Sequence, residues 1–360
     1  MSKELLFYCN IPILYSNDPI FNQVPGFNNY RTFAHYFDVN VSLCDRSNVI
    51  KFPFKMKSSP MPVFDKDFNL SYKECALSRM AELDTLHKQT GKKFRLLYSG
   101  GVDSSAIFSS FIEYYGLDKT KDILEICCSK ESIDENPWLW DRYIRKANFD
   151  IVSAHDHGYQ WSDDKIIIMG EGNDQLFGKR SDYAYYASNP IGSKEITLQD
   201  VKHYLKYKSS NINGDGVAHI FFNLLKSAPF PITNMFTFLW WINFVLTWDG
   251  VLNRVISQST LNKLQDNKLV QFYNTIEFQQ WSMNYHYRYD ITLAPLYKHE
   301  CKELTIDILN IPEYKNKHKF LSFPKLHAVR PTAFLIDEDL YLYRNTSAYL
   351  KFVQPNNSFI

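Results

Sequence analysis

The chain of 360 residues is long enough to bury a substantial core, and it is expected to form two domains or one large domain with a smaller one appended. Its 40 basic and 39 acidic residues leave a net charge of +1 without a basic stripe, so nucleic acid is not a favoured partner. Six cysteines without metal-ligand spacing, and a start that lacks signal-peptide features, are typical of a cytoplasmic protein.

Residues 1–90 are expected to form a small N-terminal module of unassigned role. Several prolines separate short apolar runs in this part, and residues 71–87 then carry apolar side chains at helical spacing. The pattern changes at residue 94. Residues 94–98 predict a strand, a Gly-rich turn follows, and residues 106–112 predict a helix.

Strands and helices alternate through residues 94–180, the expected sheet core of a second domain that spans residues 91–360. Residues 123–128, 150–153 and 165–169 predict three more strands, and residues 138–147 predict a helix. This alternation indicates an α/β protein with a doubly wound parallel sheet. From about residue 180 the strand signals fade, so residues 181–360 are expected to form an α-helical lobe. Residues 230–248 approach membrane length, but polar residues interrupt them, which favours a buried core helix and no membrane span.

The turn after the first predicted strand has the sequence S-G-G-V-D-S-S, residues 99–105. Its two glycines permit backbone conformations and close approach that other residues disfavour. Backbone N–H groups, serine hydroxyls and the positive end of the following helix together suit a phosphate or pyrophosphate. Asp103 has two possible roles here, which are capping the helix and holding a Mg²⁺ ion. The spacings of a Walker loop and of a dinucleotide fingerprint are both absent.

A second motif, G-E-G-N-D-Q-L-F-G at residues 170–178, directly follows the fourth predicted strand. The first turn resembles the S-G-G-x-D-S signature of the PP-loop ATP pyrophosphatases. The second motif resembles the G-E-G-x-D-E-x-F-G-G-Y segment of the asparagine synthetases and of their relatives, the β-lactam synthetases and lasso-peptide cyclases. The resemblance covers about residues 94–325, and it implies the adenine nucleotide α-hydrolase-like fold of that superfamily.

The resemblance implies that ATP and Mg²⁺ bind where both motifs emerge from the carboxyl edge of the sheet. Asp103 and Asp174 would hold the Mg²⁺, and Glu171 would face the substrate as a base or an orienting carboxylate. Helix capping is the alternative role for Glu171 and Asp174. The residues expected to contact the nucleotide are Ser99, Gly100, Gly101, Asp103, Ser104, Ser105, Cys128, Gly170 and Gly172.

A third stretch, from residue 294 to residue 321, resembles more loosely the family's run of x-P-F-L-D, an amphipathic helix, a Leu-Pro step and K-[YW]-[IL]-[LF]-R. In the family the late lysine supports the leaving pyrophosphate. Lys315, Lys317 and Lys319 compete for this role. Lys319 fits best because an aromatic and an aliphatic residue follow it, so it is the expected catalytic lysine, and a solvated basic loop is the alternative.

The chain also departs from the family pattern. Ser2 stands where asparagine synthetases have their glutaminase cysteine, so glutamine hydrolysis by that route is not expected, and ammonia or an amine could come from a separate donor protein. Gln175 replaces an acidic residue, and Lys179 and Arg180 replace the end of the second motif. The resemblance implies an AMP-forming ligase that adenylates a carboxylate or amide oxygen of a small molecule or peptide. The alternatives are a PP-loop enzyme that modifies tRNA or a nucleobase, and a non-catalytic nucleotide-binding relative.

Overall fold

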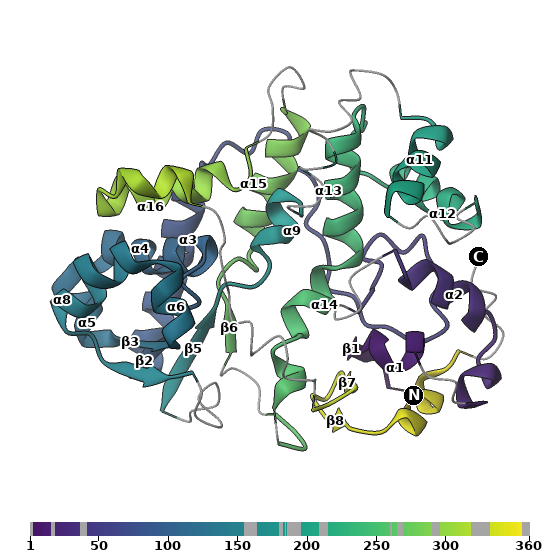
Figure 1. Ribbon diagram of the computed structural model, residues 1–360, viewed down its shortest axis with the longest axis horizontal. Helices are drawn as coiled ribbons and strands as arrows, with labels where there is room; N and C mark the ends of the chain where they lie inside the picture. Colours follow the sequence, from purple (N-terminus) through teal and green to yellow (C-terminus); the bar gives the residue numbers. More distant parts are fainter. Residues whose placement is uncertain are drawn as a thin grey trace.

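The computed structural model describes residues 3–15, 19–36, 42–154, 164–179, 183, 185, 196–208, 215–259, 261–264, 269–289, 296–317 and 332–354. Within them the chain forms two sheets surrounded by helices (Figure 1). The strands are β1 Leu5–Tyr8, β2 Lys93–Leu97, β3 Leu124–Cys128, β4 Ile151–Ser153, β5 Lys165–Met169, β6 Leu269–Gln271, β7 Leu335–Asp337 and β8 Leu342–Tyr343. The first helices are α1 Asn10–Tyr15, α2 Phe27–Ala34, α3 Tyr72–Thr90, α4 Val102–Tyr115, α5 Leu117–Ile123, α6 Lys130–Glu135, α7 Pro137–Leu139 and α8 Arg145–Ala147. The later ones are α9 Asn173–Phe177, α11 Leu198–Lys208, α12 Asp215–Leu225, α13 Met235–Leu246, α14 Trp248–Asn253, α15 Ile276–Tyr287 and α16 His299–Leu309.

The larger sheet has five parallel strands in the order β4-β3-β2-β5-β6. The chain moves outward from β2 through β3 to β4, and then returns to the other side of β2 to form β5. The strand order therefore reverses between β2 and β5, and ligands of open parallel sheets bind at such a switch point, beyond the carboxyl ends of the strands. These observations confirm an α/β fold with a parallel sheet, compatible with a doubly wound arrangement.

The four strands predicted between residues 94 and 169 are all present, with boundaries that differ by at most one residue. Buried apolar side chains explain why β3 and β5 were visible in the sequence, because a strand covered on both faces is apolar nearly throughout. The helix predicted over residues 138–147 also forms, and a π-helical turn from Trp140 to Ile144 interrupts it.

The part after residue 180, expected to be an α-helical lobe, also contains three short strands that the sequence did not reveal. β6 extends the parallel sheet beside β5, and β7 and β8 join β1 in a three-stranded sheet. These strands have only two or three residues, which is too short for an alternating pattern to appear in the sequence. Figure 1 shows β1 beside β7 and β8, on the opposite side of the molecule from β2 and β3. The division at residue 90 stays a prediction.

The apolar segment at residues 230–248 contains α13, whose residues are all buried, as the sequence predicts. Its indole nitrogens find partners inside the protein, since Trp240 donates to Ser282 and Trp241 to the carbonyl of Leu224. Among the described residues, no single helix is long and apolar enough to span a membrane. One bent pair, Met235–Leu246 with Trp248–Gln258, has the length and composition but turns by 52° between its two helices.

Candidate functional site

The turn at residues 99–105 connects the end of β2 to the beginning of α4, next to the switch point. Gly100 has a φ of +71°, and a Cβ at this position would lie 2.1 Å from the carbonyl oxygen of Ser132. Only glycine satisfies both conditions without moving the backbone. Ser129 begins the adjacent helix α6 with a capping box, which fixes the backbone that lies against Gly100.

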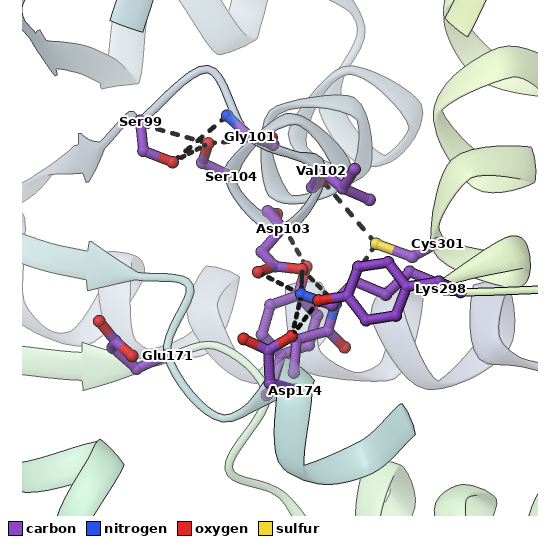
Figure 2. A network of polar contacts seen from close by, with 12 residues as sticks. Ser99, Gly101, Val102, Asp103, Ser104, Glu171, Asp174, Lys298 and Cys301 are labelled. Atoms are coloured by element: carbon purple, nitrogen blue, oxygen red, sulfur yellow. Dashed lines mark hydrogen bonds and ion pairs between the residues drawn. The ribbon is translucent and has the colours of Figure 1, made fainter. Parts of the chain in front are cut away.

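The hydroxyls of Ser99 and Ser104 face each other across this turn. Their oxygens are 3.2 Å apart, and the backbone N–H of Gly101 donates to the Ser99 hydroxyl at 3.3 Å (Figure 2). Ser104 and Ser105 are both buried, but the Ser105 hydroxyl accepts a hydrogen bond from Asn136 at 3.1 Å. Two of the three predicted serine hydroxyls therefore contact each other within the turn, and the third is bound to an asparagine side chain.

The second motif lies directly beside this turn, as the sequence predicts. A Cβ on Gly170 would be 3.3 Å from the Cβ of Asp103, so the loop after β5 passes close to the first turn of α4. Gly172 has a φ of +98° and precedes α9. Asn173, buried at the start of α9, donates to Asp103 at 2.7 Å. The two motifs form one site.

Lys298 lies at the centre of this site and was not predicted from the sequence. Its Nζ is 2.7 Å from both carboxylate oxygens of Asp103 and 2.7 Å from Oδ1 of Asp174. Tyr297 donates its hydroxyl proton to Asp174. Burial alone would lower the pKa of Lys298, but the two carboxylates outweigh it and hold the pKa well above its ordinary value. Figure 2 shows the three charged side chains pointing toward one another.

A signal for Lys298 exists in the sequence. The run A-P-L-Y-K at residues 294–298 has lysine where the family run x-P-F-L-D has its aspartate. This run contributes to the family resemblance, but its last residue was not predicted to be a site residue. Residues 294 and 295 lie outside the described part of the chain.

Glu171 lies apart from this cluster (Figure 2). Nη2 of Arg254 donates to both of its carboxylate oxygens, at 2.8 and 2.9 Å. Both side chains are about one quarter exposed, so the pair lies at the rim of the site and is partly solvated. The carboxylate of Glu171 is therefore paired with the guanidinium of Arg254. A carboxylate that acts as a general base would instead be free to accept a proton.

The late lysines differ in their surroundings. Lys317 is buried, and its Nζ lies 3.4 Å from Oε1 of Glu135 and donates to the carbonyl oxygen of the same residue. The Cβ of Glu135 would in turn be 2.9 Å from a Cβ on Gly100. Burial lowers the pKa of Lys317, although Glu135 opposes this shift. Lys315 is exposed, and the predicted catalytic Lys319 lies outside the described residues.

Comparison with known proteins assigns no role to these residues. No family model and no curated protein matches this chain. The resemblance to asparagine synthetases therefore rests on the two motifs and on their common position at the sheet edge. Cys128, the remaining predicted contact, ends β3 and is buried, and burial raises the pKa of its thiol to about 11.

Proposed function

We propose that the protein is an ATP-dependent, AMP-forming ligase of the PP-loop type, with an adenine nucleotide α-hydrolase-like fold and a site similar to that of asparagine synthetases. The observation that supports this most directly is the position of the two motifs. The Ser99 turn follows β2 and the Gly170 loop follows β5, and these are the two strands between which the strand order reverses. Ligand sites of parallel α/β sheets lie at this point.

The phosphates of ATP would bind at the Ser99 turn. Gly100 lets the turn pack closely against α6, the hydroxyls of Ser99 and Ser104 lie together in the turn, and the positive end of α4 favours anions. These donors are fixed before a ligand arrives, so they could stabilise the charge that develops on a departing pyrophosphate.

In the proposed reaction, a carboxylate or amide oxygen of the substrate attacks the α-phosphorus of ATP. The bond from the α-phosphorus to the bridging oxygen breaks, and pyrophosphate leaves with the electron pair. An amine or ammonia then attacks the acyl carbon, AMP leaves, and the amine loses a proton. Lys317 would support the pyrophosphate, because its ammonium lies beside Glu135, which packs against Gly100. No step is assigned to Mg²⁺, because both of its predicted carboxylate ligands are bound to Lys298.

The same ion pairs favour a second candidate, a nucleotide-binding relative without catalysis. Arg254 holds Glu171, and Lys298 holds Asp103 and Asp174, so the three acidic residues predicted for chemistry all have cationic partners in the protein. Such a protein would bind ATP at the Ser99 turn without converting it.

Incubation with α-labelled ATP and pools of amino acids or peptides, with ammonia or amines present, distinguishes the two candidates. The ligase is expected to form AMP and pyrophosphate. ATP binding without turnover would identify the non-catalytic candidate, and ADP as the product would contradict both.

Ser99→Ala is expected to weaken AMP formation. Ser109→Ala is the matched control, since that hydroxyl lies inside α4 and donates to the carbonyl of Ser105. Equal activity of the two variants would contradict the phosphate site.

A further inference from the structure

Asp103 and Asp174 are the two carboxylates predicted to hold Mg²⁺, and a cation of the protein already lies between them. The Nζ of Lys298 is 2.7 Å from an oxygen of each, and its side chain is only 4% exposed. The carboxylates are more open, at 27% exposed for Asp103 and 46% for Asp174. The lysine therefore fills the inner part of the cluster, and the carboxylates form its outer part.

Mg²⁺ does not fit this arrangement. It requires oxygen ligands at about 2.0–2.1 Å in octahedral geometry. An ion that bridges Asp103 and Asp174 would need the space that the ammonium occupies, and two cations cannot share it. Elsewhere among the described residues, no group of three or more His, Cys, Asp or Glu side chains could hold a metal ion.

The local backbone at Lys298 does not favour a lysine. Lys298 has a φ of +54°, in the left-handed region that residues other than glycine disfavour. It also immediately precedes α16, where the positive end of the helix dipole repels a cation. Both effects oppose a lysine at this position, so its interactions with the two carboxylates must offset them. Its Nζ also lies 5.2 Å from the centre of the Tyr297 ring.

We infer that Lys298 is the resident cation of the Asp103–Asp174 pair and takes the place of a divalent metal ion bound by the protein. The two carboxylates at the surface of the cluster are therefore already neutralised by a lysine ammonium, and they would not recruit Mg²⁺ for a phosphate group bound nearby. This inference about metal binding goes beyond the proposed function. It does not depend on that function, because it concerns only interactions between side chains of the protein.

The experiment titrates the protein with Mn²⁺, followed by electron paramagnetic resonance of the free ion, with no nucleotide present. The wild-type protein is expected to bind no Mn²⁺ at this pair. Lys298→Met removes the cation, and we expect it to gain a Mn²⁺ site at least about tenfold tighter than any wild-type binding. Adding Asp174→Asn to Lys298→Met should abolish the gained site. Lys298→Arg keeps a cation and should bind no more Mn²⁺ than the wild type.

Circular dichroism establishes that each variant is folded. A folded Lys298→Met protein that gains no Mn²⁺ site would overturn the inference. Wild-type Mn²⁺ binding that Asp174→Asn abolishes would also overturn it, and this second arm holds even if Lys298→Met fails to fold. ATP is absent throughout, so the result is independent of whether the protein forms AMP.

Discussion

The ammonium of Lys298 lies 2.7 Å from both carboxylate oxygens of Asp103, a residue 195 positions earlier in the chain. This contact joins the position before α16 to the first turn of α4. We expect a double-mutant cycle with Lys298→Met and Asp103→Asn to give a coupling free energy of unfolding of about 1–3 kcal/mol, because the pair is largely removed from water. Urea unfolding of the wild type, the two single variants and the double variant measures this coupling free energy.

The surface pair of Lys73 and Glu113 is the matched control. Its atoms are 2.6 Å apart, but the side chains are 42% and 34% exposed. The same cycle with Lys73→Met and Glu113→Gln should give less than about 1 kcal/mol, because water screens exposed pairs. Equal coupling in the two cycles would mean that Lys298 contributes no more than a surface ion pair.

Gly100→Ala should destabilise the protein more than Gly91→Ala does. Both glycines have positive φ values, +71° and +67°, so the backbone strain is matched. A Cβ at Gly91 has no atom within 4 Å, whereas one at Gly100 would lie 2.1 Å from the Ser132 carbonyl oxygen. We expect the free energy of unfolding to fall by about 1 kcal/mol in Gly91→Ala and by about 3 kcal/mol or more in Gly100→Ala. Urea unfolding measures both losses. Equal losses would show that the turn tolerates a side chain.

Lys317 and Lys315 should differ sharply in the adenylation assay. If the buried Lys317 stabilises the departing pyrophosphate, Lys317→Met should lower the rate of AMP formation by roughly 10²-fold with little change in ATP affinity. Lys315→Ala, at an exposed position two residues earlier, should leave the rate unchanged. Single-turnover kinetics with labelled ATP separates the rate from the affinity.

The Lys317 variant leaves Glu135 buried without its cation, so Glu135→Gln is combined with Lys317→Met to remove that charge. The rate should stay low in the combined variant if the lysine acts on the pyrophosphate. Recovery of the rate would assign Lys317 a purely structural role. If Lys319→Ala alone loses activity, the lysine expected from the sequence pattern is the correct one.

His286 should make the protein less stable in mild acid. It stacks on Trp240 with ring centres 4.2 Å apart, and burial holds its pKa well below 6.5. The unfolded chain therefore binds a proton near pH 6.5 and the folded protein does not. The free energy of unfolding should fall as the pH drops below 6.5, by up to about 1.4 kcal/mol per pH unit. Denaturant unfolding between pH 7.5 and 5.5 measures this loss.

His286→Phe keeps an aromatic ring against Trp240 and removes the titrating group. This variant should lose less stability than the wild type over the same pH range. An identical loss in both proteins would assign the acid sensitivity to other groups.

The sequence by itself determined four of the five parallel strands and the place of the first turn. β3 and β5 are apolar nearly throughout, and β2 has a short run of apolar residues, so these strands can be predicted without knowledge of their neighbours. The glycines of the Ser99 turn were equally visible, because few residues adopt such a backbone. Ligands of parallel sheets bind at the carboxyl edge, and this rule predicted that the two motifs lie at the same edge. The structure confirms that position.

Only the tertiary structure decided which cation meets which carboxylate. Asp103, Asp174 and Lys298 come from three distant parts of the chain, and no local pattern links a lysine at residue 298 to an aspartate at residue 103. The same holds for Arg254 with Glu171, and for the two- and three-residue strands β6 to β8, which form by pairing with longer neighbours. Local spacing encodes strands and turns through backbone preference, whereas ion pairs between distant residues depend on how the finished fold brings them together.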